Sequence, residues 1–332
     1  MNTLGAIAIT GPTASGKTAL SISLARSLGC EIISLDSMQI YKGMDVGTAK
    51  ATAEERATVA HHMLDVVLPS EEYSTELYRD AALKAARDIV LGGKIPLFVG
   101  GTGLYLDTLL RAPQTDVPKS DALRDSLIRS AQDETGRHAL WERLRTIDPD
   151  SAEKIHENNV RRVARAIEIY ESTGRTKTEL DRLSKERAED INILNLTLDF
   201  HNRDTLYERV DKRVDLMIEG GLVPEVETLY KSGRLPKEST AAQAIGYKEI
   251  ISYIDGECTL AEAVLKIKLS TRHYAKRQIT WFRHTDALRI YMDSEDGSLR
   301  LPEEILSELI LHTKAFLDKN KRADLPVIKF KG

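Results

Sequence analysis

The stretch Gly11-Pro12-Thr13-Ala14-Ser15-Gly16-Lys17-Thr18 decides the fold that we expect. It follows a short apolar run at residues 6–9, typical of a buried strand, and leads into a helical pattern over residues 18–28. A glycine-rich loop between a strand and a helix is the context of a P-loop, whose backbone N–H groups turn inward on phosphate oxygens. Lys17 would add a positive charge, and the Thr18 hydroxyl is placed to bind Mg²⁺. Residues 11–18 therefore predict a binding site for a di- or triphosphate.

The composition limits the classes of protein that fit. Of the 332 residues, 42% are apolar and 30% are charged, as in soluble globular proteins. A net charge of −4 means that any affinity for nucleic acid must come from local basic patches. Cys30 and Cys258 show no metal-ligand spacing, and no secretory leader precedes the first strand pattern. No apolar run approaches the ~20 residues of a membrane helix, so we expect a cytoplasmic protein with no membrane partner.

Three further segments are expected at the sheet edge that carries the P-loop. Residues 31–36 predict a strand ending at Asp36, where ligands of open α/β sheets bind. A strand at residues 95–99 turns through residues 100–103 into a helix, which brings Thr102 to the same edge. Residues 41–50 carry two glycines and little periodicity, which favours a loop across the site. Each has an ordinary alternative, namely a solvated strand end, an empty turn and a surface connection.

The order of strand and helix patterns predicts an insertion. Residues 121–188 are polar, charged and helical, and a strand pattern returns at residues 191–200. A helical block between strand-forming segments indicates a domain inserted into an α/β core. We therefore expect an α/β fold with a P-loop NTPase-like core, a parallel sheet and an inserted all-helical domain. The expected bounds are 1–113 and 191–318 for the core, 114–190 for the insertion and 319–332 for a flexible tail.

Basic residues gather on three of the predicted helices. Arg161 and Arg165 lie one turn apart in the insertion and could bind neighbouring phosphates. Arg209 and Arg213 flank the apolar stripe of a helix over residues 204–220, where they either form structural salt bridges or bind an anion. The helical run 260–284 alternates basic with aromatic residues, which suits either a nucleic-acid surface or core packing.

Several separated motifs together resemble one family, the tRNA dimethylallyltransferases, also called tRNA isopentenyltransferases. The resemblance runs from residue 5 to about 292, and its motifs at 36–50 and 276–283 do not belong to the general P-loop kinase pattern. The chain lacks the C-terminal zinc-finger extension of some relatives, so it resembles the shorter, bacterial-type members. The motifs are Gly-Pro-Thr-Ala-Ser-Gly-Lys-Thr at 11–18, Asp-Ser-Met-Gln-Ile-Tyr-Lys-Gly-Met-Asp-Val-Gly-Thr-Ala-Lys at 36–50, Val-Gly-Gly-Thr-Gly-Leu-Tyr at 99–105, Arg-Arg-Val-Ala-Arg-Ala at 161–166, Gly-Tyr-Lys at 246–248 and Lys-Arg-Gln-Ile-Thr-Trp-Phe-Arg at 276–283.

The resemblance implies transfer of a dimethylallyl group from its diphosphate to N6 of the adenosine 3′ of the anticodon in tRNA. Diphosphate is then the leaving group, and residues 11–18, with Mg²⁺ at Thr18, would stabilise its growing charge. Asp36 matches the general base that takes a proton from the adenine amine, and Arg213 acts with Lys17 on the diphosphate. We expect a monomer whose helical insertion binds the anticodon stem-loop.

The resemblance also implies a set of tRNA contacts on both parts of the chain. The expected tRNA-binding residues are Asp36, Ser37, Met38, Gln39, Thr102, Arg124, Arg161, Arg162, Val163, Ala164, Arg165, Gly246, Tyr247, Lys248, Lys276, Arg277, Gln278 and Arg283.

Three other functions share part of this pattern. An adenylate isopentenyltransferase uses the same donor on a free nucleotide, although a mononucleotide needs no basic insertion of this size. A P-loop nucleotide kinase would bind ATP and need an arginine-rich lid. A nucleotide-gated RNA-binding module would leave Asp36 without a role.

Overall fold

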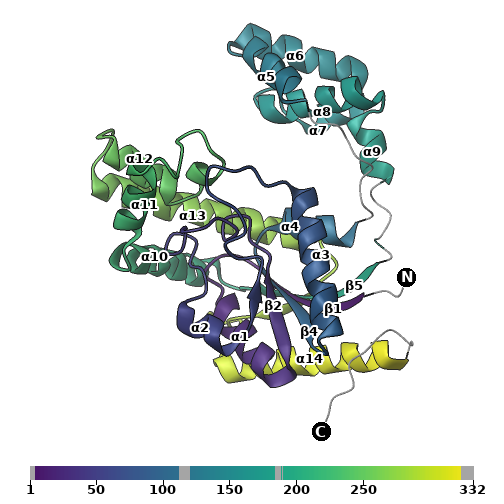
Figure 1. The fold of residues 1–332 in the computed structure, drawn as a ribbon, viewed down its shortest axis with the longest axis vertical. Coiled ribbons are helices and arrows are strands. Elements are labelled where there is room, and N and C mark those ends of the chain that lie inside the picture. The colour runs from purple at the N-terminus through teal and green to yellow at the C-terminus, as the bar shows by residue number, and fades with distance from the viewer. Residues whose placement is uncertain (1–3, 112–119, 184–187, 189, 323–332) are drawn as a thin grey trace. The chain divides into compact units, whose positions relative to one another are not determined.

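The computed structural model describes residues 4–111, 120–183, 188 and 190–322 (Figure 1). The chain divides into two compact units. The first, here the core unit, joins Met1–Leu109 to Asp190–Gly332, and the second, the helical unit, is Leu110–Glu189. No helix within the described ranges is long and apolar enough to cross a membrane.

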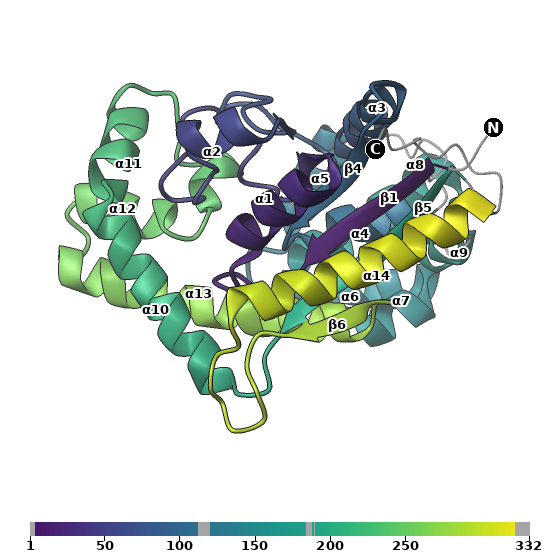
Figure 2. The same cartoon turned by 90° about the horizontal axis from the view of Figure 1, so that it is seen from below.

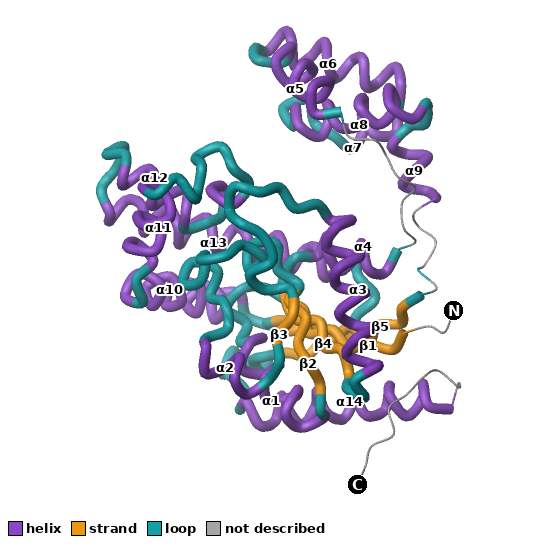
Figure 3. Tube along the Cα trace, viewed as in Figure 1, coloured by secondary structure: helices purple, strands orange, loops and turns teal. Residues whose placement is uncertain are grey.

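A parallel sheet forms the centre of the core unit (Figure 3). Its six strands lie in the order β3-β2-β4-β1-β5-β6, and every neighbouring pair is parallel. This arrangement confirms the predicted α/β class. The short β3 was not predicted, because two histidines carry no apolar pattern. The strands are β1 (Leu4–Thr10), β2 (Cys30–Ser34), β3 (His61–His62), β4 (Ile95–Gly100), β5 (Ile191–Asp199) and β6 (Leu288–Tyr291).

Helices cover both faces of this sheet (Figure 2). The connection from β1 through α1 (Lys17–Leu28) to β2 runs across the sheet in the opposite direction to that from β3 through α3 (Thr75–Leu91) to β4. Right-handed crossovers in opposite directions place their helices on opposite faces. The last helix, α14 (Pro302–Arg322), packs beside α1. It continues past the expected end of the core, so residues 319–322 are helical rather than part of a tail, and residues 323–332 lie outside the described residues.

A second group of helices packs beside the sheet at the carboxyl ends of its strands. The loop after β2 packs into its core through Ile40, Tyr41 and Met44. The sequence patterns predicted α10 and α13 but missed α11, although Leu222, Val226 and Leu229 have helical spacing. These elements are α10 (Arg203–Glu219), α11 (Leu222–Lys231), the 3₁₀ turn η1 (Ala241–Gln243), α12 (Tyr247–Ile254) and α13 (Leu260–Arg283). The remaining short helices of the core unit are α2 (Ala53–Thr58) and α4 (Gly103–Leu110).

The helical unit contains five helices and, among its described residues, no strand of the sheet. Local signals fix the helix ends. The side chains of Ser120, Asp133 and Asp148 accept hydrogen bonds from backbone N–H groups in the first turns of α5, α6 and α7. Gly174 ends α8 in the left-handed conformation. The helices are α5 (Asp121–Ser130), α6 (Glu134–Ile147), α7 (Pro149–Lys154), α8 (Val160–Thr173) and α9 (Lys177–Leu183).

Candidate active site

The P-loop lies between β1 and α1, as expected. Gly11 adopts φ 134°, and a Cβ there would lie 2.4 Å from the Leu198 carbonyl oxygen, so only glycine fits. The Lys17 ammonium folds over the loop and donates to the carbonyls of Gly11 and Pro12 at 3.0 and 2.6 Å. Residues 13–18 of the loop, Lys17 among them, line one cavity together.

Two remote side chains hold the P-loop in place. Gln278 of α13 accepts a bond from the Thr13 N–H at 2.8 Å and donates to the Gly101 carbonyl at 2.9 Å, which ties the P-loop to the glycine turn after β4. Arg209 of α10 donates to the Ala14 carbonyl at 2.9 Å. Gln278 was expected to contact tRNA, but it is only 5% exposed and both groups of its amide are committed, so its observed role is structural.

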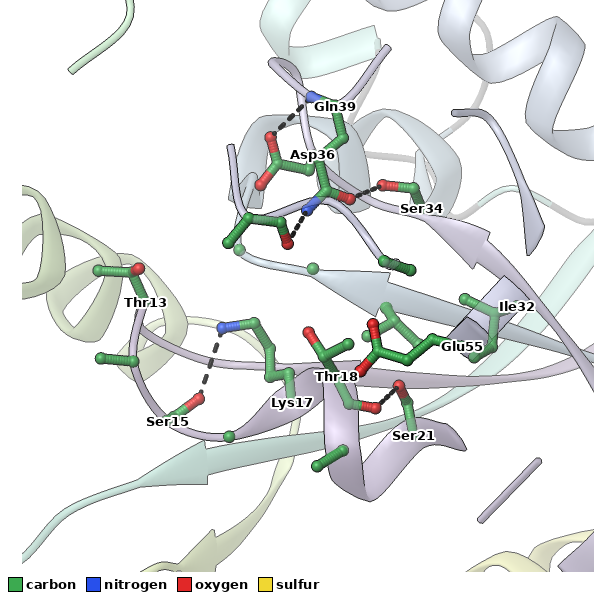
Figure 4. A pocket seen from close by; sticks show the side chains of 18 of the residues that line it. Thr13, Ser15, Lys17, Thr18, Ser21, Ile32, Ser34, Asp36, Gln39 and Glu55 are labelled. Carbon is green, nitrogen blue, oxygen red and sulfur yellow. Dashed lines mark hydrogen bonds between the residues drawn. The ribbon is translucent and has the colours of Figure 1, made fainter. Parts of the chain in front are cut away.

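Asp36 follows β2 and lies at the sheet edge beside the P-loop (Figure 4). Its Oδ1 accepts the N–H groups of Met38 and Gln39 at 2.8 and 3.3 Å, which fixes the carboxylate in the turn that follows the strand. Among the described residues, none donates a hydrogen bond to Oδ2. One carboxylate oxygen is therefore held, and the other faces the site.

Thr102 lies beside the same turn. Its hydroxyl accepts a hydrogen bond from the Ser37 N–H at 3.1 Å, and its own N–H donates to the Leu35 carbonyl at 3.1 Å. The predicted meeting of the glycine turn with the Asp36 segment is thus confirmed. It follows from the parallel pairing of β2 with β4, whose carboxyl ends lie together.

Two cavities meet at Asp36. The first, of about 310 Å³, is lined by residues 13–18 of the P-loop, and the second, of about 320 Å³, by Met38, Met217, Ile245 and other residues. Residues shared by the linings of both cavities are Thr13, Asp36, Arg213 and Tyr274. The site therefore has a phosphate-binding compartment and a more apolar one, with Asp36 between them.

Arg213 of α10 lines both cavities. Within residues 4–111 and 190–322, no carboxylate forms an ion pair with its guanidinium. Burial lowers the pKa of Arg213, and the nearby Asp36 opposes this shift. Burial, with a smaller effect from Arg213, also lowers the pKa of Lys17 to about 7, while Asp36 again acts in the opposite direction. Two half-buried cations that form no ion pair with any described carboxylate favour binding of an anion here.

The phosphate compartment also has oxygen ligands that suit Mg²⁺. The Thr18 hydroxyl, the Asp36 carboxylate and the Glu55 carboxylate line it (Figure 4). No cluster of three or more His, Cys, Asp or Glu side chains with metal-site geometry occurs among the described residues. Mg²⁺ commonly binds one or two protein oxygens and completes its shell with phosphate oxygens and water, so this ligand set fits the ion.

The expected tRNA contacts in the core unit divide into two groups. Asp36, Ser37, Met38, Lys248 and Arg277 line the second cavity. Gln39 holds the turn, and Lys276 and Arg283 lie exposed on α13. Gly246 and Tyr247 are buried, with Tyr247 0% exposed, so neither lies at the surface of this structure, and the expected contact stays a prediction.

The expected contacts in the helical unit divide in the same way. Arg161 and Arg162 are exposed. Val163 and Ala164 belong to the hydrophobic core of the unit, which accounts for their conformation without tRNA, and the expected contact by them stays a prediction. Arg124 makes a bidentate hydrogen bond to the buried Glu168, at 2.8 and 3.0 Å. Arg165 approaches the same carboxylate as an ion pair at 2.9 Å without an aligned hydrogen bond.

Sequence reasoning missed two residues near the site. Tyr274 was noted only as one of several aromatics, yet it lines both cavities and lies under the Arg277 guanidinium. Glu225 belongs to no motif, and its partners lie about 180 residues away in the chain. Helical spacing on α13 could have indicated Tyr274 beside Gln278, but no local pattern indicates Glu225.

The comparisons with known proteins agree with this geometry. The family model described as IPP transferase matches residues 39–285. A tRNA dimethylallyltransferase of Anoxybacillus flavithermus is 47% identical over 90% of this chain and 94% of the relative. This chain belongs to the IPP transferase family. The crystal structure of a tRNA isopentenylpyrophosphate transferase from Bacillus halodurans is 38% identical, with a TM-score of 0.70 over 97% of this chain and 99% of that chain.

The likeness extends to a solved structure from a eukaryote. The structure of a eukaryotic dimethylallyltransferase acting on tRNA is 30% identical, with a TM-score of 0.77 over 98% of this chain and 81% of that chain. The family predicted from the separated motifs is thus confirmed.

Proposed function

We propose that this chain is a tRNA dimethylallyltransferase, which transfers a dimethylallyl group from dimethylallyl diphosphate to N6 of the adenosine 3′ of the anticodon and releases diphosphate. The observation that carries the proposal is the position of Asp36, between a cationic phosphate compartment and a second, more apolar compartment. A donor diphosphate and an adenine can approach the same carboxylate from two sides.

The phosphate compartment acts on the leaving group. As the bond between the dimethylallyl carbon and the diphosphate oxygen breaks, negative charge grows on the diphosphate. The P-loop amides, Lys17 and Arg213 would stabilise that charge more strongly in the transition state than in the ground state. Mg²⁺ held by the Thr18 hydroxyl would add a further positive charge at these oxygens.

Asp36 acts on the nucleophile. The exocyclic amine of adenine shares its lone pair with the ring, so it attacks carbon effectively only when a base removes its proton. The Asp36 Oδ2 carries no hydrogen bond from any described residue, whereas Oδ1 is held by two backbone amides. The carboxylate is thus oriented by one oxygen and can accept the proton on the other.

The acceptor is tRNA rather than a free nucleotide because basic residues lie outside the cavities. Lys276 and Arg283 on α13, and Arg161 and Arg162 on α8, are exposed and can contact the RNA backbone. A target base must leave its stack to reach an enclosed cavity. Recognition of the anticodon stem-loop by the helical unit, the monomeric state and the cytoplasmic location remain predictions.

One incubation tests the proposal. The protein is mixed with dimethylallyl diphosphate, Mg²⁺ and unmodified tRNA, and the digested RNA is analysed by mass spectrometry. We expect N6-dimethylallyladenosine at the position 3′ of the anticodon. A parallel incubation with AMP tests the adenylate isopentenyltransferase alternative. Product on AMP but not on tRNA would replace the proposal, and ATP-dependent phosphorylation of a nucleotide would favour a kinase.

A further inference from the structure

Glu225 of α11 accepts an unusual number of hydrogen bonds from one loop. Its Oε2 accepts the N–H groups of Asp45 and Val46 at 2.9 and 2.7 Å. Its Oε1 accepts the Gly47 N–H at 3.1 Å and the Tyr247 hydroxyl at 2.6 Å. Three successive amides of the loop and a buried phenol therefore converge on one carboxylate.

Gly47 allows this close approach. A Cβ at Gly47 would lie 2.4 Å from Cε2 of Tyr247 and 2.8 Å from Cδ1 of Leu222. Tyr247 is 0% exposed, and its pKa is raised by burial and by the neighbouring Glu225. The phenol therefore stays protonated and can donate to the carboxylate, while its ring holds the loop against α11 and α12.

Lys50 anchors the other end of the same loop. Its ammonium donates to the Tyr41 carbonyl at 2.9 Å and to the carboxylates of Asp45 and Asp65 at 2.6 and 2.7 Å. The Lys50 side chain is 0% exposed, so these are the bonds that compensate its burial. Residues 44–50 are thus held at two points, by Glu225 and by Lys50.

The loop in turn forms part of the site. Gly47 and Thr48 line the second cavity, and Ala49 lines the phosphate compartment. The Gln39 amide donates to the Thr48 carbonyl at 3.2 Å. The Gln39 backbone N–H donates to Asp36 Oδ1 at 3.3 Å, a bond that Figure 4 shows. The loop is therefore joined through Gln39 to the carboxylate proposed as the base.

We propose that Glu225 is a positioning residue for the transfer reaction, which sets the 44–50 loop as a wall of both cavities and, through Gln39, helps to orient Asp36. Glu225 lines neither cavity, so it acts without touching a substrate. The inference rests on the proposed function, because it assigns Glu225 a part in that reaction.

The chemistry of the contact requires a carboxylate. Four donors face its two oxygens, and a carboxylate accepts all four. In Glu225→Gln the side chain keeps its shape, but its NH₂ group would face two of these donors. Two donors in this partly buried contact would lose their partners, and the loop would move to restore them. Displacement of a positioned group by about 1 Å can lower a rate by ~10²-fold.

The test compares Glu225→Gln with Glu227→Gln, a change on the same helix at a partly exposed residue that pairs only with Lys231 among the described residues. Single-turnover transfer is measured at saturating dimethylallyl diphosphate and tRNA, and hydrogen exchange is followed at the amides of residues 44–50. We expect Glu225→Gln to transfer about 10- to 100-fold more slowly with faster exchange at these amides. The dissociation constants for tRNA and diphosphate should match those of Glu227→Gln.

Two further variants separate positioning from general destabilisation. Glu225→Asp keeps the carboxylate and should recover part of the rate. Tyr247→Phe keeps the three amide bonds and should give a smaller loss of transfer rate, again with faster exchange at residues 44–50. If Glu225→Gln does not fold, Tyr247→Phe provides the test. Unchanged transfer in a folded Glu225→Gln, or equal loss of rate and of tRNA affinity, overturns the inference while the proposed function stands. A wild-type protein that transfers nothing overturns both.

Discussion

The two units of the chain use buried or half-buried charges in opposite ways. In the core unit, Lys17 and Arg213 line a cavity, and no described carboxylate forms an ion pair with either. In the helical unit, Arg124 and Arg165 converge on Glu168, whose side chain is 0% exposed. From sequence alone all four look equally suited to phosphate. Pairing within the fold distinguishes the four residues, because an arginine that is already paired with a carboxylate attracts an anion only weakly.

This comparison makes a general expectation for mutants. Changes to the unpaired charges of the core unit should lower the rate of transfer but hardly change the free energy of unfolding, since burial of a charge without a ligand destabilises the fold. Changes to the paired charges of the helical unit should lower the free energy of unfolding and leave kcat for transfer unchanged. The predictions below test this division, beginning with the largest effect.

The largest effect is expected for Asp36→Asn, which keeps the shape of the side chain but removes the proton acceptor. A general base contributes about 10²–10⁴-fold, so kcat should fall by that factor while donor and tRNA still bind. Single-turnover rates at saturating donor separate the loss of proton transfer from any loss of donor affinity. Near-normal chemistry in this variant would remove Asp36 from the role of base.

Arg213→Gln should give the next largest effect. The loss of one charged donor at a group that gains charge in the transition state lowers rates by about 10²–10³-fold, and we expect kcat/KM for the donor to fall accordingly. Because the guanidinium has no ion-pair partner among the described residues, the free energy of unfolding should not decrease. Arg203→Gln, at the exposed start of α10, is the control. If Arg213→Gln were less stable than wild type but had normal kinetics, Arg213 would be a structural residue and our division between the two units would be wrong.

Glu168→Gln should show the opposite pattern. Burial alone would raise the pKa of Glu168, but hydrogen bonds from Arg124 and Ser120 and the charge of Arg165 lower it to about 2. A carboxylate with a lowered pKa stabilises the fold above its unfolded pKa of ~4.3, and that stability is lost as the pH falls toward 2. The variant should lose about 1–3 kcal/mol at pH 7, because the arginines are partly exposed and can reach water. Its difference from wild type should shrink below pH 4.

Fluorescence can follow this loss in the helical unit alone. Trp141 lies in α6 of that unit, and Trp281 lies in α13 of the core unit. In a Trp281→Phe background, urea unfolding monitored by fluorescence therefore reports the helical unit. The kcat for transfer by Glu168→Gln should match that of the protein without this change. A variant that is as stable as wild type at pH 7 would show that the ion pairs are not structural.

The sequence predicted most of the fold because its signals are local. The P-loop lies between an apolar run and a helical pattern, and the strand before Asp36 ends in the turn that holds the carboxylate. Contacts between remote residues gave no such signal. Arg124 and Glu168 are 44 positions apart, and Glu225 and Asp45 are 180 apart, so neither pairing has a local pattern. The helix pattern left Arg213 either salt-bridged or bound to an anion, and the family resemblance favoured the diphosphate. That no described carboxylate forms an ion pair with it became visible only in the fold.

The smallest effect is expected on the salt dependence of tRNA binding by the exposed basic residues. It compares a paired with an unpaired arginine on the same helix. Arg161 and Arg165 lie one turn apart on α8, but only Arg165 is paired with Glu168. Each phosphate contact that is lost should lower the slope of log K for tRNA against log salt by about one, which corresponds to about a fourfold change in affinity between 50 and 200 mM salt. We therefore expect this loss in Arg161→Gln, and in Lys276→Gln on α13 if that surface also contacts tRNA. Arg165→Gln should change the slope less, because its charge already interacts with Glu168. Filter binding over a range of salt concentrations measures all three slopes. A larger change in Arg165→Gln than in Arg161→Gln would show that tRNA displaces the ion pair, so that pairing in the free protein would not identify the residues that contact RNA.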